Sequence, residues 1–382
     1  MMKLETLLAR ITDNAKPGDP FGASHLPIYQ TATFDLKKQE GDEIFDYSRS
    51  DNPTRKSLER LFAMAEQGVG AICTNTGLAA LALLFETALQ AGDTVLVEQG
   101  CYGGTFRLLK LLKEKNNITT VYVDFTDLES VKTVLKQSAP KLILCESPTN
   151  PALKVVDIAA IVELAHDKGI PVAVDNSMAT FASQLPLTLG ADYSVFSTTK
   201  FISGHGAVIA GAVVVNNPHL FKKLRFIANV QGRAQSPMDV FLLSLGLPTL
   251  TYRMKAQEQS ALSIAKFLET HPKVNKVVFP GLESHPQYDL AKKQMKIIPA
   301  ILLVEFASEE LVTTVIKNTK LFGEKASFGC ADSRIEAPVS ISHASFSAEE
   351  LATLGISSKM VRIAIGLEDT SDLIADLEQA LG

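Results

Sequence analysis

The sequence predicts an α/β protein with a large, mostly parallel, seven-stranded sheet domain followed by a smaller C-terminal α+β domain. Short apolar runs alternate with amphipathic helical stretches between about residues 71 and 217. The chain has 382 residues, of which 46% are hydrophobic, so it can bury a large core and form two domains. After residue 217 helical patterns dominate, and strand-like and helical patterns then alternate again.

The first 55 residues are irregular and rich in Pro, Gly, Asp and aromatic residues, with little periodic apolar sequence. We therefore expect residues 1–55 to form an N-terminal arm and the first helical pattern to begin at Ser57. The larger domain is expected at 56–245 and the smaller at 246–382, with a linker at 237–248.

Seven apolar runs are expected to form the larger sheet, with helices on both faces. These runs are 71–73, 94–97, 119–123, 141–145, 171–174, 193–196 and 208–215. Helical spacing occurs at 79–90, 104–115, 128–137 and 158–168. The last run follows its predecessor too closely for a crossover helix, which allows it to pair antiparallel. In the smaller domain, strand-like and helical segments alternate at 274–279, 300–306, 309–318, 360–365 and 370–381.

Composition excludes several classes of partner. The net charge of −5 has interspersed signs and no basic stripe, so we expect no nucleic-acid partner. The N-terminus carries charges that interrupt any secretory signal, and no apolar run approaches the roughly 18 residues that span a bilayer. The four cysteines are scattered without metal-ligand spacing, so no metal site is expected. These features predict a cytoplasmic protein without a membrane partner.

One lysine, Lys200, lies among hydroxyl residues directly after the apolar run 193–196. A lysine at the end of a buried strand is costly unless it is paired or neutralised. A desolvated lysine amine readily forms a Schiff base with an aldehyde, and the flanking Ser197 and Thr199 would suit a phosphate beside that aldehyde. The segment therefore points to pyridoxal 5'-phosphate as cofactor.

Polar residues that follow the other predicted strands fit one site, because ligands of such sheets bind at the carboxyl ends of the strands. Asp175 could hold a pyridine nitrogen protonated, or be a helix cap or a paired surface carboxylate. Gly77 and Leu78 begin a strongly helical stretch whose N-terminus would attract a phosphate, although an ordinary turn is the alternative.

Three further side chains have chemistry that suits such a cofactor or its substrate. Tyr102 could stack on a flat ring or simply pack on a loop. Tyr47 and Arg49 could bind a phosphate, although composition alone favours a solvated turn for this pair. Arg362 stands on an apolar strand and needs an anion, which could be a protein carboxylate or a substrate carboxylate.

Competing motifs find little support. The segment 197–200 matches S-x-x-K, but neither S-D-N nor K-T-G follows it. The chain has no G-x-G-x-x-G motif, no P-loop and no H-E-x-x-H motif.

Taken together, these motifs resemble the Cys/Met-metabolism enzymes that use pyridoxal phosphate, the trans-sulfuration family, along almost the whole chain. The resemblance implies the aspartate-aminotransferase-like (type I) fold. The segments that carry it are 47–49 with 52–54, 102–105, 146–151, 174–176, 197–205, 280–287 and 361–368.

The resemblance assigns a role to each candidate residue. Lys200 would be the Schiff-base lysine and proton shuttle, Asp175 would hold the pyridine nitrogen, and Tyr102 would stack on the ring. The remaining roles are phosphate binding by Gly77, Leu78, Ser197 and Thr199, and binding of the substrate α-carboxylate by Asn150, Ser327 and Arg362. In this family Tyr47 and Arg49 reach the phosphate of a neighbouring subunit, which implies a homo-oligomer, usually a tetramer built as a dimer of dimers with shared sites.

The reaction expected from the resemblance is γ-elimination of cystathionine, giving cysteine, 2-oxobutyrate and ammonia. Asp332 would meet the distal ammonium of that substrate. The chain departs from the family pattern at Ala207, Phe328 and Arg334, which leaves cystathionine γ-synthase, cystathionine β-lyase and methionine γ-lyase as alternatives. From another class, a protein that has kept the fold and lost turnover is a further alternative.

Overall fold

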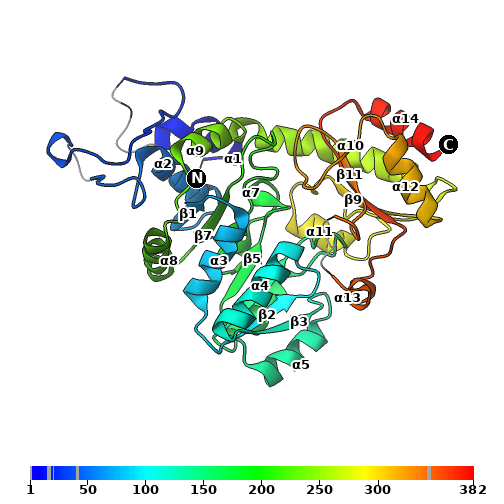
Figure 1. The fold of residues 1–382 in the computed structure, drawn as a ribbon, viewed down its shortest axis with the longest axis horizontal. Helices are drawn as coiled ribbons and strands as arrows, with labels where there is room; N and C mark the ends of the chain where they lie inside the picture. Colours follow the sequence, from blue (N-terminus) through cyan, green and yellow to red (C-terminus); the bar gives the residue numbers. More distant parts are fainter. Residues whose placement is uncertain (1, 15–18, 20, 40–42, 342–345) are drawn as a thin grey trace.

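The computed structural model describes residues 2–14, 19, 21–39, 43–341 and 346–382. Two sheets organise this part of the chain (Figure 1). The larger sheet has the strand order β1-β7-β6-β5-β4-β2-β3. Its strands are β1 (Gly70–Thr74), β2 (Thr94–Glu98), β3 (Thr119–Val123), β4 (Leu142–Glu146), β5 (Val172–Asp175), β6 (Tyr193–Phe196) and β7 (Gly211–Val215). Each coincides with one of the seven predicted runs, so the predicted α/β fold class is confirmed.

Strand direction follows from the connections. β2 to β6 pair in parallel, whereas β7 pairs antiparallel with both β1 and β6. The short connection after β6 leaves no room for a crossover helix, so β7 runs back beside β6 in the opposite direction. The antiparallel pairing considered for the last run is therefore what the structure shows.

Helices cover both faces of the larger sheet, which explains why its strands are apolar on both sides. Val95 and Val97 of β2 pack in one core with residues of α3 and α4, while Leu96 packs in another with residues of α5 and α6. The helices are α2 (Pro53–Ala65), α3 (Gly77–Ala88), α4 (Gly103–Asn116), α5 (Leu128–Ser138), α6 (Ile158–His166), α7 (Thr180–Ser183) and α8 (Pro218–Gln231), with a 3₁₀ turn η3 (Pro186–Leu189).

Two features of the N-terminal arm and linker differ from the sequence prediction. A short helix, α1 (Leu4–Ala9), buries Leu7 and Leu8, and α2 begins at Pro53 rather than Ser57 because the Asn52 side chain caps it. The expected linker at 237–248 contains helix α9 (Pro237–Ser244), which is capped by a serine side chain. The remaining turns are η1 (Ile11–Asn14), η2 (Leu36–Lys38) and η4 (Leu247–Thr249).

The smaller sheet has the order β10-β11-β12-β9-β8 and is antiparallel except for the pair β10·β11. Its strands are β8 (Val274–Val278), β9 (Ile301–Phe306), β10 (Gly323–Glu324), β11 (Arg334–Glu336) and β12 (Met360–Ala364). The helices are α10 (Leu250–Glu269), α11 (Tyr288–Gln294), α12 (Glu309–Asn318), α13 (Ala348–Thr353) and α14 (Thr370–Leu381). The five predicted segments are all present, whereas β10 and β11 are too short to have shown a periodic pattern.

Helix α10 connects the two parts of the molecule. Leu250 and Met254 near its start belong to a core that includes α2 and β7, whereas Ala261 and Ile264 belong to the core of the smaller sheet. We propose that the smaller domain begins with this helix, close to the expected residue 246. Among the described residues, none of the helices has the length and apolarity needed to cross a membrane.

Candidate active site

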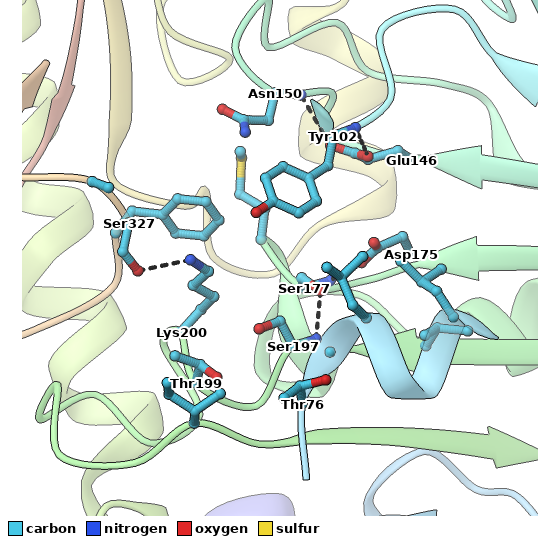
Figure 2. A pocket seen from close by; sticks show the side chains of 18 of the residues that line it. Thr76, Tyr102, Glu146, Asn150, Asp175, Ser177, Ser197, Thr199, Lys200 and Ser327 are labelled. Carbon is cyan, nitrogen blue, oxygen red and sulfur yellow. Dashed lines mark hydrogen bonds between the residues drawn. The ribbon is translucent and has the colours of Figure 1, made fainter. Parts of the chain in front are cut away.

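A cavity of about 510 Å³ lies at the carboxyl ends of the parallel strands. It is lined by the segments that follow β1, β4, β5 and β6, by the start of α4, and by residues of the smaller sheet and its loops. The predicted residues that line it are Gly77, Leu78, Tyr102, Asn150, Asp175, Ser197, Thr199, Lys200, Ser327 and Arg362. Folding thus brings most of the predicted site residues into one cavity (Figure 2).

Lys200 projects from the loop after β6, and its Nζ donates a hydrogen bond to Ser327 Oγ at 2.7 Å (Figure 2). The Nζ also lies 4.9 Å from the centre of the Phe328 ring. Burial lowers the pKa of the Lys200 ammonium to about 8, and the positive charge of Arg362 adds to this decrease. A substantial fraction of the amine is therefore neutral near pH 8, as a nucleophile and proton acceptor must be.

Asp175 is the last residue of β5, and its side chain is buried at the cavity wall. Its Oδ1 accepts a hydrogen bond from the backbone N–H of Ser177 at 3.0 Å. Burial raises the pKa of Asp175, and the contacts with Ser177 and the charge of Lys200 oppose that increase. No ion pair of Asp175 occurs within the described residues, so a protonated ring nitrogen placed here would supply the missing counter-charge.

The opposite side of the cavity is formed by the turn before α4. Tyr102 is about one-third exposed, and its ring faces the cavity (Figure 2). A Cβ at Gly104 would lie 2.3 Å from Cε1 of that ring, so only glycine allows the ring to lie against the start of the helix. Glu146, a residue without an assigned role in the sequence analysis, accepts hydrogen bonds from the backbone N–H groups of Tyr102 at 2.8 Å and Asn150 at 3.1 Å.

Glu146 ends β4 as Asp175 ends β5, which is the signal that could have identified it. Burial, and then the charge of Asp175, raise the pKa of Glu146 well above its usual range. Arg107 of α4 and Glu336 of β11 also line the cavity, and neither stands in a motif that the sequence analysis recognised.

The N-terminus of α3 meets the loop after β6 and forms a cradle for an anion. The Thr76 side chain caps α3 by accepting from the Ala79 N–H at 2.9 Å. A Cβ at Gly77 would lie 2.7 Å from the Ser197 Cβ, so glycine keeps this space open. Helix N–H groups and the hydroxyl groups of Ser197 and Thr199 lining one cavity have the chemistry of a phosphate site.

Arg362 on β12 is buried, and the two other residues predicted to bind the substrate α-carboxylate contact it. Its Nη1 donates to Asn150 Oδ1 at 3.0 Å and its Nη2 donates to the Ser327 carbonyl at 2.9 Å. The Nε has no hydrogen-bond partner among the described residues. A buried, unpaired donor on a cationic side chain that lines the cavity fits a carboxylate ligand.

Three predicted residues lie outside the cavity. Arg49 donates to the carbonyl of Asn229 on α8 at 2.9 Å, and its guanidinium lies 5.4 Å from the ring centre of Tyr47. Asp332 is paired with Arg334, at 3.1 Å between Oδ1 and Nη2, and with Lys325, at 3.2 Å between Oδ2 and Nζ. The expected contact of Asp332 with a substrate ammonium therefore has no free carboxylate oxygen in this structure.

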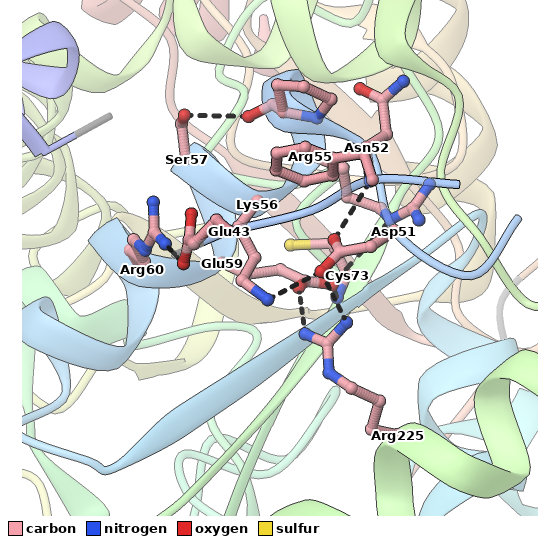
Figure 3. Close-up of polar contacts among 12 residues, drawn as sticks. Glu43, Asp51, Asn52, Arg55, Lys56, Ser57, Glu59, Arg60, Cys73 and Arg225 are labelled. Carbon is pink, nitrogen blue, oxygen red and sulfur yellow. Dashed lines mark hydrogen bonds and ion pairs between the residues drawn. The ribbon is translucent and has the colours of Figure 1, made fainter. Parts of the chain in front are cut away.

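The segment that carries Tyr47 and Arg49 is anchored by a network of charges (Figure 3). Arg225 of α8 pairs with Glu59 at 2.6 Å and with Asp51 at 3.5 Å. Arg55 donates to the backbone carbonyl of Ser48 at 2.8 Å. These contacts fix the segment against α2 and α8, away from the cavity of its own chain.

The residues present fit pyridoxal phosphate. The cavity combines a buried lysine with a lowered pKa, an acid without a counter-ion, an open cradle at a helix N-terminus and a guanidinium with an unpaired donor. Among the described residues no cluster of side chains suits a metal ion.

Comparison with known proteins agrees with this geometry. Over 363 residues the chain is 40% identical to a cystathionine γ-lyase of Dictyostelium discoideum, covering 94% of this chain and 93% of that protein. It is also 40% identical, over 363 residues, to a chloroplastic cystathionine β-lyase of Mimosa pudica, covering 95% and 79%. A crystal structure of cystathionine γ-synthase from Xanthomonas oryzae pv. oryzae, in complex with aminoacrylate and cysteine, superposes with a TM-score of 0.95 at 36% identity, covering 100% and 98%.

A family model agrees with these relatives over almost the whole sequence. Residues 5–382 match the family described as Cys/Met metabolism PLP-dependent enzyme. The chain therefore belongs to the family of Cys/Met-metabolism enzymes that depend on pyridoxal phosphate, and pyridoxal phosphate is its cofactor.

Proposed function

We propose that this enzyme cleaves the Cγ–S bond of cystathionine by γ-elimination, giving cysteine, 2-oxobutyrate and ammonia. The observation that carries the proposal is the position of Lys200, whose amine has a pKa of about 8 and projects into a buried cavity between an acid and a carboxylate-binding guanidinium. The names of the similar proteins, which are cystathionine lyases and a synthase, support chemistry on a sulfur amino acid.

Each proposed step uses a group of this chain. Arg362, with Asn150 and the Ser327 carbonyl, would orient the α-carboxylate so that the α-carbon faces Lys200. When bound, pyridoxal phosphate withdraws electrons from the α-carbon. Asp175 would keep the ring nitrogen protonated, and Tyr102 would hold the ring plane by stacking.

Proton transfer would be the task of the Lys200 amine. The free amine would take a proton from the α-carbon and then one from the β-carbon, and its ammonium form would return a proton to the γ-sulfur, which leaves as the thiol of cysteine. One water molecule would then convert the four-carbon fragment into 2-oxobutyrate and ammonia. One amine can do both steps because its lowered pKa lets it act as base and then as acid near neutral pH.

A second candidate is γ-replacement on an O-acyl-homoserine, the reaction type of cystathionine γ-synthase. The O-acyl group that departs in this reaction carries no ammonium, so its binding needs no free Asp332 oxygen, and both oxygens of Asp332 are paired with Arg334 and Lys325. The Xanthomonas oryzae structure gives it further support. β-Elimination and methionine γ-elimination use the same groups, and no particular contact favours them.

We propose in addition that two chains share their active sites, in dimers that pair into tetramers. Tyr47 and Arg49 are held away from their own cavity, which supports a role for them at the phosphate of a partner's site.

Product identification tests the proposed reaction. Purified protein is incubated with pyridoxal phosphate and cystathionine, and the products are separated. Cysteine with 2-oxobutyrate and ammonia supports γ-elimination, whereas homocysteine with pyruvate identifies β-elimination and contradicts the proposal. If cystathionine is left intact and an O-acyl-homoserine reacts with cysteine, the enzyme is a synthase.

A further inference from the structure

Glu336 and Arg362 are direct cross-strand neighbours in the smaller sheet. β11 pairs antiparallel with β12, and in this register Glu336 lies opposite Arg362. Directly opposed residues of an antiparallel pair project from the same face, so their side chains meet. Glu336 Oε1 lies 3.0 Å from Arg362 Nη2, and the two side chains are 1% and 3% exposed.

This ion pair supplies the only formal negative charge that contacts Arg362 among the described residues. Its two other partners, Asn150 Oδ1 and the Ser327 carbonyl, are neutral acceptors. Apart from the ion-pair contact with Arg362, neither Glu336 oxygen has a hydrogen-bond partner within the part of the chain that the structure describes. Glu336 also lines the cavity, so its buried carboxylate lies beside the space that a substrate would enter.

We propose that Glu336 is a positioning residue for substrate binding: it is the counter-ion of Arg362 in the substrate-free enzyme and competes with the substrate α-carboxylate for that guanidinium. The inference rests on the proposed role of Arg362 as carboxylate anchor, and is independent of which carbon–sulfur bond is broken. When substrate binds, two carboxylates flank one buried guanidinium, and their repulsion is strong because little water screens it.

The Glu336 carboxylate has two opposing effects: it orders the Arg362 guanidinium, and it lowers the affinity of that guanidinium for the substrate. Without substrate, the carboxylate of Glu336 holds the guanidinium in place and compensates a charge that would otherwise be buried alone. With substrate, the same carboxylate weakens the attraction between Arg362 and the incoming α-carboxylate. Removing the charge of Glu336 while keeping its shape therefore strengthens substrate binding.

Two substitutions separate the effect of the Glu336 charge from that of its side-chain length. Glu336→Gln keeps the volume and removes the charge, and we expect KM to fall about threefold to tenfold while kcat changes less than about threefold. Glu336→Asp keeps the charge on a shorter side chain, and we expect KM to stay at or above the wild-type value. The matched control is Glu368→Gln, since Glu368 binds the Ser333 N–H and hydroxyl, each at 2.7 Å, and does not line the cavity.

A measurement without turnover isolates carboxylate binding. L-alanine carries an α-carboxylate and has no leaving group at its γ-position. Its binding to the cofactor-loaded enzyme raises Tm by an amount that increases with the logarithm of affinity at a fixed, saturating alanine concentration. We expect a larger alanine-induced Tm increase in Glu336→Gln than in the wild type and in Glu368→Gln. Cofactor absorbance confirms that each variant is loaded.

The outcomes are distinct. An unchanged or higher KM in Glu336→Gln, with an unchanged alanine effect, overturns the proposal, as does a KM decrease in Glu336→Asp. This second variant decides the matter if Glu336→Gln does not fold. If Arg362→Leu leaves the alanine effect intact, the anchor role fails and the Glu336 proposal fails with it. If no sulfur substrate reacts but Glu336→Gln binds alanine more tightly, the proposed function fails and the Glu336 proposal stands.

Discussion

The Nζ of Lys200 lies 2.7 Å from the hydroxyl of Ser327, although 127 positions separate the two residues in the sequence. Lys200 follows the last parallel strand of the larger sheet, and Ser327 precedes β11 of the smaller one, with φ at +80°. A non-glycine residue rarely adopts this conformation and keeps it only where the surrounding structure enforces it. The active site is therefore complete only when the two sheets pack against each other.

Replacing Lys200 should abolish turnover. Because Lys200→Ala removes the group proposed to move protons at both carbons, we expect a loss of at least about 10²–10⁴-fold in kcat, measured with cystathionine. The surface variant Lys132→Ala is the control, since the one ion pair of Lys132 within the described residues is with the exposed Glu129. An active Lys200→Ala enzyme would disprove the proposed mechanism.

Reconstitution of the cofactor-free enzyme should depend on pH. Only the neutral amine of Lys200 attacks an aldehyde, and burial lowers the pKa of this amine to about 8. The rate of cofactor incorporation, followed by absorbance, should therefore rise about tenfold per unit as pH increases toward 8 and level off above it. A rate that keeps rising to pH 10 would show that the amine keeps its ordinary pKa.

Gly77 should be required for phosphate binding. In Gly77→Ala the new methyl group would lie 2.7 Å from the Ser197 Cβ and close the cradle. We expect at least about a tenfold weaker affinity for pyridoxal phosphate, measured by titration of the cofactor-free protein. Ala88→Gly, at the far end of the same helix, should lower stability by about 1 kcal/mol without this loss of affinity. Equal affinities in the two variants would argue against the cradle.

Arg334 should control whether Asp332 can recognise a distal ammonium. Arg334→Leu breaks the pair with Asp332, so the ratio of kcat/KM for cystathionine over methionine should rise about threefold to tenfold. In Asp332→Ala the same ratio should fall or stay low. Stability should change little, since the Asp332 side chain is 43% exposed. An unchanged ratio in both variants would remove Asp332 from substrate recognition.

Sharing of sites predicts complementation between two inactive variants. Lys200→Ala lacks the catalytic amine, and Arg49→Ala lacks the proposed phosphate contact to the partner's site. When equal amounts are unfolded and refolded together, half of the dimers are hybrids with one intact site, so about one quarter of wild-type activity should return. Refolding each variant alone is the control, and no gain on mixing would mean that each chain builds its own site.

The sequence by itself determined the order and type of the main elements and the location of the site. Apolar runs and helical spacing depend on neighbouring residues, so the seven strands of the larger sheet could be predicted from 71–73 to 208–215. Because ligands of parallel sheets bind at the carboxyl ends of strands, Asp175 and Lys200 could be assigned to one site from the sequence alone.

Only the tertiary structure decided which groups pair with one another. β10 and β11 are too short for a pattern, so neither the contact of Glu336 with Arg362 nor that of Asp332 with Arg334 could be foreseen. The pairing of Glu336 with Arg362 depends on the register of two strands that are distant in the sequence, and that of Asp332 with Arg334 depends on the directions of two side chains only two positions apart. Sequence periodicity determines local elements, but the neighbours of a buried charge are determined by the packing of the whole chain.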